Sequence, residues 1–291
     1  MRMTIAVVSL AAVSLLANLV LWWWFRRELG RRGQLEEERK FALAEANLKM
    51  LAQSELVEEQ KFKMAEANIA LLEQKEIIER ERERSEKLLL NILPAKIAND
   101  LKEHGRAEPE SFDNVTALFS DIVGFTRKAV SIEPKRLIEE LNELFTAFDR
   151  IAASNGCERI KTIGDAYLCV CGMPSPDELH AAKIVKTARE MVIWLRDRNQ
   201  RAEHQWEIRV GVHSGKVVGG VVGVDKYIYD VFGDTINTAS RMESHSEPMR
   251  VNLSETTHSL VKDEFPCLER EAVEVKGKGG LKMYFVEFPN G

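Results

Sequence analysis

The chain has 291 residues, which fits one catalytic domain together with an accessory region. Its formal net charge of −5 gives no reason to propose nucleic acid as a partner. Its four cysteines are most simply explained as reduced thiols in the cytoplasm.

Residues 3–25 are 23 consecutive positions without a charged side chain, about the length that a helix needs to cross a bilayer. The run ends in three tryptophans at 22–24, which favour the membrane–water interface, and four arginines follow before residue 33. This pattern predicts a membrane anchor at 1–33, single-pass in the cell membrane, with the catalytic domain in the cytoplasm. The alternative is a secretory signal peptide, but no convincing cleavage site follows.

Residues 34–87 lack glycine and proline and consist mainly of good helix formers. Residues 37–53 are echoed at 58–74, an offset of 21 residues or three heptads. Apolar side chains recur every seven residues at Leu43, Met50, Val57, Met64, Leu71 and Ile78, while the other seam position holds alanine and glutamine. This pattern predicts a parallel, self-associating coiled-coil helix. A second stripe (Phe41, Leu48, Phe62, Ile69) leaves the partner face open, and a solvated single helix is the alternative.

Residues 88–110 form a predicted linker in which Pro94 should kink or restart the helix. The predicted catalytic domain covers 111–291. Its patterns predict, in chain order, a strand at 115–123, a helix at 134–156, strands at 158–164 and 166–172, a helix at 176–200 and a strand at 207–215. This order is that of an α+β, ferredoxin-like βαββαβ sheet, elaborated here at its C-terminal end. The fold alone implies no function.

Two aspartates occupy matching settings, Asp121 in FSDIVGFT and Asp165 in KTIGDAYLCV. Each lies where an apolar strand reaches a turn that contains glycine, and neighbouring strand ends bring such residues together. Two carboxylates beside a turn of free backbone N–H groups suit Mg²⁺ bound with a triphosphate. The pair therefore indicates phosphoryl or nucleotidyl transfer, although a lone aspartate at a strand end is more often a turn former or helix cap.

Four blocks in this order, FSDIVGFT, IKTIGDAY, YDVFGDTINTASRME and VKGKGGLKMYF, resemble the catalytic domain of class III nucleotide cyclases. The resemblance covers roughly residues 110–288, and LLLNILPAKIA is similar to the linker before such domains. It implies cyclisation of a nucleoside triphosphate to its 3′,5′-cyclic monophosphate with release of pyrophosphate. It also implies that sites form between two catalytic domains, so that a homodimer would have two.

The resemblance assigns roles residue by residue. It implies two metal ions, Mg²⁺ or alternatively Mn²⁺, held by Asp121 and Asp165 with the Ile122 carbonyl as an extra ligand. The backbone N–H groups of the turn Val123, Gly124, Phe125 and Thr126 would line the phosphates. Asn237 resembles the residue that orients the ribose, and Arg241 the one that stabilises charge on the α-phosphate. Lys276 resembles a phosphate-contacting lysine, although Lys278 could take that place.

Base choice follows from hydrogen bonding at two positions, Lys161 and Asp230, where guanylyl members carry glutamate and usually cysteine. Adenine offers an acceptor at N1 and a donor at its 6-amino group, so a lysine and an aspartate complement it. These residues predict ATP as substrate. The alternatives are a guanylyl or dual-substrate cyclase of the same fold, and a silent dimerising membrane scaffold. Membrane lipid and a membrane partner protein are further candidate partners.

Overall fold

The structure is a computed structural model that describes residues 2–223, 226–275 and 279–288, with the backbone alone at 2–13 and 273–275. The chain divides into two compact units, residues 1–84 and 85–291. Each unit is built differently, because the first is a single helix and the second contains every strand of the described chain.

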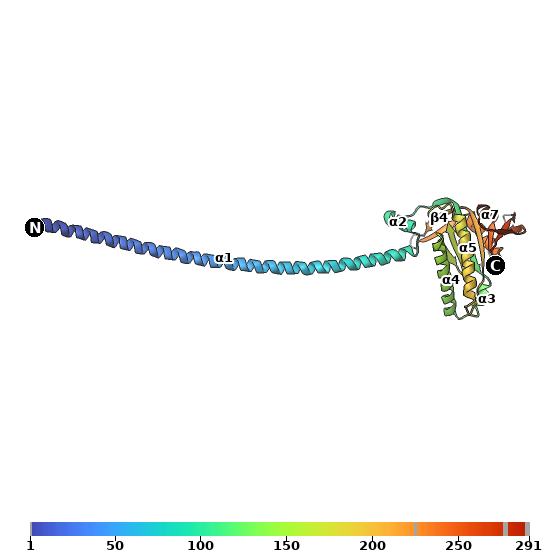
Figure 1. The fold of residues 1–291 in the computed structure, drawn as a ribbon, viewed down its shortest axis with the longest axis horizontal. Helices are drawn as coiled ribbons and strands as arrows, with labels where there is room; N and C mark the ends of the chain where they lie inside the picture. Colours follow the sequence, from blue (N-terminus) through green and yellow to red (C-terminus); the bar gives the residue numbers. More distant parts are fainter. Residues whose placement is uncertain (1, 224–225, 276–278, 289–291) are drawn as a thin grey trace. The chain divides into compact units, whose positions relative to one another are not determined.

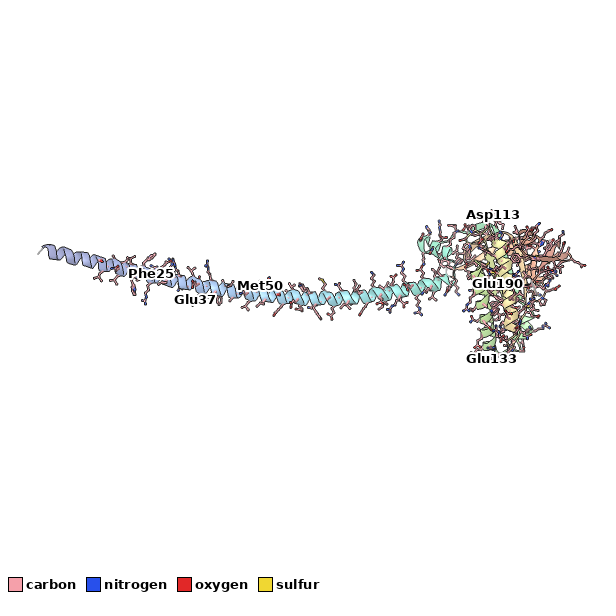
Figure 2. All side chains as sticks on the ribbon, in the orientation of Figure 1. Phe25, Glu37, Met50, Asp113, Glu133 and Glu190 are labelled. Carbon is pink, nitrogen blue, oxygen red and sulfur yellow. The ribbon has the colours of Figure 1, made fainter. Side chains whose placement is uncertain are left out.

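The first unit lies within α1 (Arg2–Leu90), an uninterrupted helix (Figure 1). Its surface carries ion pairs four residues apart, such as Lys49 with Glu45 at 2.9 Å, which support an isolated helix. The apolar column from Leu43 to Ile78 projects into solvent, with Val57 47% and Met64 66% exposed, and Figure 2 shows Met50 standing out from the ribbon. The helix predicted at 34–87 is confirmed, and its self-association stays a prediction.

The predicted membrane span at 3–25 includes residues 3–13, whose side chains lie outside the described residues. Within the part of the chain that is described, no helix is both long and apolar enough to cross a bilayer.

The second unit starts with the end of α1, and Pro94 separates it from α2 (Ala95–His104), as predicted. Ile97 and Ala98 of α2 are buried against the sheet, in a cluster that includes Phe112 and Tyr229. Lys102 reaches back to Glu86 at 2.6 Å. The predicted linker is therefore a docked helix.

The sheet and its helices follow in the order β1 (Glu110–Ile122), α3 (Phe125–Ala129), α4 (Pro134–Ser154), β2 (Glu158–Ile163), β3 (Ala166–Cys171), α5 (His180–Asn199), β4 (Ile208–Val222), β5 (Ile228–Phe232), α6 (Asp234–Ser244), β6 (Val251–Ser254), α7 (Glu255–Val261), β7 (Cys267–Glu269) and β10 (Met283–Val286). Strands β8 (Val273–Val275) and β9 (Gly279–Leu281) form a separate hairpin. The main sheet has the order β2-β3-β1-β4-β6-β10-β7, with β5 added to β4. The βαββαβ core is confirmed, while α3 was not predicted and β4 runs on beyond its predicted end at 215.

Successive side chains of each strand point to opposite faces of the sheet, so the strands contribute to two hydrophobic layers. Leu118 lies under α4 and α5, which Figure 1 shows side by side, in a core with Phe148 and Met191. Phe119 points to the other face, where α2, α6 and the β4–β5 ribbon cover the sheet. The candidate site residues lie at the edges of these layers.

Helix α6 rests directly on β4 at Gly211. A Cβ atom there would lie 1.9 Å from the backbone N of Glu243, so only glycine allows the helix to come this close. Gly211 therefore fixes the position of α6 and of the side chains that it carries.

Candidate active site

Asp121 and Asp165 come together because β1 and β3 are antiparallel neighbours, with Ser120 opposite Tyr167. Asp121 lies near the end of β1, and Asp165 lies in the two-residue turn before β3. Burial and the charge and hydrogen bond of Asp121 raise the pKa of Asp165, although the backbone N–H of Ile122 also hydrogen bonds to its carboxyl group. Two carboxyl groups this close repel one another when both are ionised, and a divalent cation removes that cost.

Arg209 joins this pair from the opposite strand. It faces Asp121 in the β1–β4 register, and its Nη2 lies 3.0 Å from Asp121 Oδ2. Its Nε lies 3.0 Å from Oε1 of Glu243 on α6, a mostly buried carboxyl group whose pKa is raised by burial. Sequence reasoning missed Arg209 and Glu243, because only the strand register and the seating of α6 place them beside Asp121.

The turn after β1 is fixed from both sides. Gly124 has φ 67°, a left-handed conformation that favours glycine, and its carbonyl accepts hydrogen bonds from the N–H groups of Arg127 and Lys128. The Val123 N–H donates to the Glu207 carbonyl at 2.8 Å. It is therefore not available to a phosphate, contrary to the prediction for Val123.

The remaining N–H groups of the turn are those of Gly124, Phe125 and Thr126. They donate to no protein acceptor among the described residues. Three backbone donors without a partner at a partly exposed turn fit the predicted contact with phosphate oxygens.

Lys161 and Asp230 form a second cluster, with Lys161 Nζ 2.5 Å from Asp230 Oδ2. The other oxygen, Oδ1, accepts the backbone N–H of Val231 at 2.8 Å. Among the described strands, β5 pairs with β4 alone, but its Tyr229 and Val231 pack beside Leu168 on the second face of the sheet. The ribbon of β4 and β5 therefore folds back over the sheet and reaches β2.

Helix α6 presents Asn237 and Arg241 four residues apart on one face. Asn237 is exposed, and Arg241 is half-buried. The Arg241 Nη1 is buried and has no hydrogen-bond partner. A buried donor without an acceptor fits an anionic ligand that completes its hydrogen bonding.

Two separate groups of predicted residues result. Asp121, Asp165 and the turn form one, and Lys161 with Asp230 forms the other. No hydrogen bond or ion pair between described residues joins these groups. Lys276 and Lys278 lie outside the described residues.

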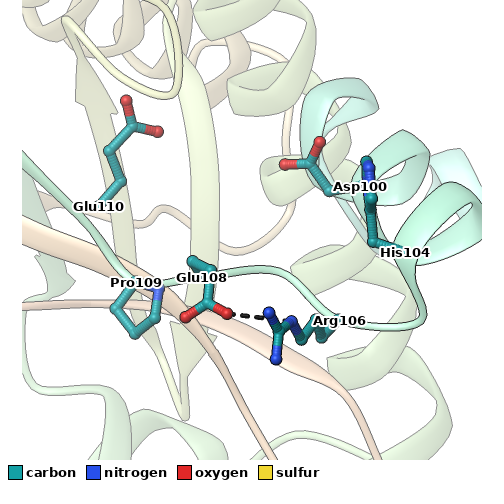
Figure 3. Close-up of a pocket in the computed structure, with 6 residues that line it drawn as sticks. All are labelled: Asp100, His104, Arg106, Glu108, Pro109 and Glu110. Carbon is teal, nitrogen blue, oxygen red and sulfur yellow. Dashed lines mark ion pairs between the residues drawn. The ribbon is translucent and has the colours of Figure 1, made fainter.

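A cavity of about 690 Å³ lies between α2 and the segment that leads into β1 (Figure 3). Its lining is polar, with Arg106 paired to Glu108 at 3.1 Å. None of the predicted site residues lines it. Among the described residues there is also no group of three His, Cys, Asp or Glu side chains that could hold a metal ion alone. Mg²⁺ at Asp121 and Asp165 would thus take its other ligands from substrate phosphates, backbone and water, as is usual for this ion.

Relatives share this domain. The chain is 41% identical over 207 residues to guanylate cyclase soluble subunit beta-2 of Rattus norvegicus, an alignment that covers 70% of this chain and 30% of that protein. It is 38% identical over 212 residues to receptor-type guanylate cyclase gcy-5 of Caenorhabditis elegans, covering 70% and 19%. The chain therefore spans less than a third of the length of these two relatives.

Solved structures of cyclases also match this chain. The catalytic core of a rhodopsin-guanylyl cyclase with converted specificity, in complex with ATPαS, matches with a TM-score of 0.60 and 36% identity over 63% of this chain and 100% of that one. The adenylyl cyclase CyaB from P. aeruginosa matches with a TM-score of 0.58 and 30% identity over 63% and 98%.

The family model for the adenylate and guanylate cyclase catalytic domain matches residues 107–288. This match takes in both groups of site residues and more than half of the chain. The protein belongs to the adenylate and guanylate cyclase family.

Proposed function

We propose that the protein is an adenylyl cyclase, which converts ATP to 3′,5′-cyclic AMP and pyrophosphate. Nucleotide cyclisation itself follows from the family. The observation that carries the choice of ATP is the ion pair between Lys161 and Asp230. An ammonium group can donate to adenine N1, and a carboxylate can accept from the 6-amino group, whereas guanine reverses both edges.

The geometry of the pair suits this task. Asp230 is held by Lys161 through one oxygen and by the Val231 N–H through the other, so its carboxylate has a fixed orientation. Lys161 uses one of its three N–H donors for this contact and keeps two for a ligand. The relatives named above include guanylate cyclases and an adenylyl cyclase, so membership of the family does not fix the base. In this proposal the side chains at 161 and 230 do.

The remaining residues account for the chemistry. Divalent metal ions held by Asp121 and Asp165 would lower the pKa of the attacking 3′-hydroxyl and neutralise charge on the leaving pyrophosphate. The N–H groups of Gly124, Phe125 and Thr126 bind phosphate oxygens. Asn237 orients the ribose and, one turn further along α6, Arg241 uses its free Nη1 to stabilise charge on the α-phosphate.

A homodimer would complete the site. The metal-binding group and the base-reading group are not joined within one chain, and the chain carries both, so two copies would form two sites. The exposed apolar column on α1 supports a parallel coiled coil that raises the effective concentration of the second catalytic domain.

The N-terminal segment supports a membrane anchor. It places Trp22, Trp23 and Trp24 before a group of arginines, with the Arg26 guanidinium 5.0 Å from the centre of the Trp22 ring. Replacing Leu16 and Leu19 by arginine should release the protein from membranes under alkaline extraction. Replacing Leu35 by arginine, outside the segment, should not. Equal release of the two variants from membranes would contradict an anchor in this segment.

Turnover by the purified full-length chain, offered ATP and GTP separately with Mg²⁺ or Mn²⁺, tests the main proposal. We expect cyclic AMP from ATP, and we expect the double variant Lys161→Glu with Asp230→Cys to gain activity on GTP. The matched control is Lys96→Glu with Glu110→Cys, which alters an exposed ion pair of the same 2.5 Å separation. Cyclic GMP from the unaltered chain would overturn the choice of base, and no product from either nucleotide would favour a silent scaffold.

A further inference from the structure

Glu140 is a buried acid in the first half of α4, and neither the sequence motifs nor the candidate site gives it a role. Its side chain is only 2% exposed. It accepts hydrogen bonds from Trp206 Nε1 at 2.7 Å and from Arg136 Nε at 3.1 Å, and its Oε1 lies 2.8 Å from His204 Nδ1. Burial acts to raise the pKa of Glu140, but the contacts with His204 and Trp206 outweigh it and keep the carboxyl group ionised.

These contacts hold the segment 204–207, which connects α5 to β4. The Asn199 side chain clamps Trp206 twice, by donating to its carbonyl at 2.6 Å and by accepting its N–H at 3.1 Å. Arg198 donates to the His204 carbonyl at 2.9 Å. The segment is thus fixed by side chains of two helices, although it belongs to no regular element itself.

The other side of this segment touches the turn that carries the candidate phosphate donors. The Glu207 carbonyl accepts the Val123 N–H at 2.8 Å. The Trp206 ring lies 6.1 Å from the Phe125 ring, centre to centre. Lys128, just after the turn, donates to the Gln205 carbonyl at 2.9 Å and lies over the Trp206 ring.

We propose that Glu140 and Trp206 are positioning residues that hold the turn 124–126 in the geometry required to bind a triphosphate. This inference rests on the proposed function, because it takes the turn as the phosphate site. Trp206 is only 1% exposed, so it acts through Phe125, and through the Glu207 carbonyl next to it that holds the Val123 N–H, and not by touching the nucleotide. A chain of contacts then runs from α4 through Glu140 and Trp206 to the turn.

The choice of a carboxylate supports a positioning role. Burying an ionised acid carries a desolvation cost that a backbone carbonyl would not incur in accepting the same indole N–H. A carboxylate instead fixes Trp206 and His204 at once, with directional, charge-assisted hydrogen bonds. Backbone donors stabilise a developing charge only when they are already in place, so a fixed turn has a direct catalytic value.

Trp206→Phe in the full-length chain tests this inference, because it removes the indole N–H but keeps an aromatic ring against Phe125. The matched control is Trp194→Phe, which alters a half-buried tryptophan that packs on Phe148 and does not touch the turn. Four quantities are measured for each: the Kd of inorganic triphosphate with Mg²⁺, the KM for ATP, the kcat for ATP, and the thermal midpoint. Emission from the tryptophans is followed during the triphosphate titration.

We expect Trp206→Phe to raise the triphosphate Kd and the KM about tenfold, the change expected when part of a charge-assisted hydrogen bond is lost. Trp194→Phe should leave the triphosphate Kd and the KM within about twofold of the unaltered chain. This should hold even if its thermal midpoint falls as much as that of Trp206→Phe. Triphosphate should change the emission of the unaltered chain and of Trp194→Phe, but not of Trp206→Phe. Glu140→Gln, which keeps an acceptor for the indole, should give a smaller rise in Kd than Trp206→Phe.

Equal Kd values in the unaltered chain and Trp206→Phe would overturn the positioning role, whatever their stability. A chain that binds triphosphate but forms no cyclic nucleotide would overturn the proposed cyclase activity alone, because the Kd comparison still applies. A chain that binds no triphosphate at all would overturn both.

Discussion

Lys161 and Asp230 meet at 2.5 Å although their strands, β2 and β5, have no backbone pairing with each other. The contact exists because the β4–β5 ribbon folds over the sheet and buries Tyr229 and Val231. The proposed recognition of the base by this pair would therefore depend on the packing of that ribbon as well as on the two side chains.

Removing one member of the base-reading pair should reduce discrimination between the two bases. Asp230→Ala takes away the proposed acceptor for the 6-amino group and leaves Lys161 without its partner. We expect kcat/KM for ATP to fall about 100-fold, while kcat/KM for GTP changes much less. Competition assays with both nucleotides measure this ratio, and an unchanged ratio would contradict base reading by Asp230.

Asp165→Asn should abolish turnover without unfolding the protein. The change removes one of two neighbouring carboxylates, so it takes away a proposed metal ligand and also the repulsion that contributes to the raised pKa of Asp165. We expect a rate at least about 100-fold lower and, without metal, a thermal midpoint at or above that of the unaltered chain. Added Mg²⁺ should raise the midpoint of the unaltered chain but not that of the variant. A variant that retains full activity would show that Asp165 holds no essential metal.

Arg209→Met should destabilise the fold, and more so at higher pH. The change leaves Asp121 and the mostly buried Glu243 without their cation, at an expected cost of about 2–4 kcal/mol. The folded-state pKa of Glu243 is already raised, and losing Arg209 raises it further. When the pKa of a group is higher in the folded state than in the unfolded state, the free energy of unfolding of the protein falls as the pH rises through the folded-state pKa. Urea unfolding at pH 5 and pH 8 should therefore show the larger loss at pH 8.

Arg159→Met is the control for this measurement, because its pair with Asp149 is exposed on both sides. Its effect should stay within about 1 kcal/mol and should not depend on pH over this range. A similar loss in both variants would argue against a special role for the Arg209 contacts.

Gly211→Ala should displace α6. Its Cβ would lie 1.9 Å from the Glu243 backbone N, so the helix or the strand must move. We expect a loss of about 3 kcal/mol or more in stability together with loss of turnover. Gly220→Ala on the same strand meets its nearest neighbour, Pro109, at 3.4 Å and should be tolerated. Near-native activity of Gly211→Ala would mean that α6 need not rest on β4.

Inserting one residue after Glu83 should lower turnover if the phase of the coiled coil matters. One residue rotates everything downstream by about 100° relative to the apolar column, whereas an insertion of seven residues restores its phase. We expect low activity for the first insertion and recovery for the second, measured as cyclic nucleotide formed at equal protein concentration. Unchanged turnover after the single insertion would leave α1 as a plain dimeriser.

The sequence was sufficient for the core of the fold, because strand and helix periods and the glycine-bearing turns are local signals. It placed the β2–β3 turn at Gly164 and Asp165 and put Asn237 and Arg241 on one helix face. The resemblance also singled out Lys161 and Asp230 as the two base-reading positions, but the contact between them was not predicted, because it depends on the folded-back ribbon.

Other features depend on tertiary packing and have no local signature. Arg209 and Glu243 join the aspartates only through strand register and the seating of α6. The Val123 N–H was predicted to face a phosphate, but the neighbouring strand brings the Glu207 carbonyl to it. Glu140 lies four residues before Leu144 and eight before Phe148, on the buried face of α4, and only the indole and imidazole that reach it explain why a carboxylate is buried there.

The seating of α6 on Gly211 has a mechanical consequence. With no space between helix and strand at Gly211, α6 cannot move closer to β4 in answer to a signal without moving the sheet. Activation of a dimer would then be a rigid rotation of one catalytic domain against its partner. A signal would then change the distance between the two half-sites and leave the internal structure of each half-site unchanged.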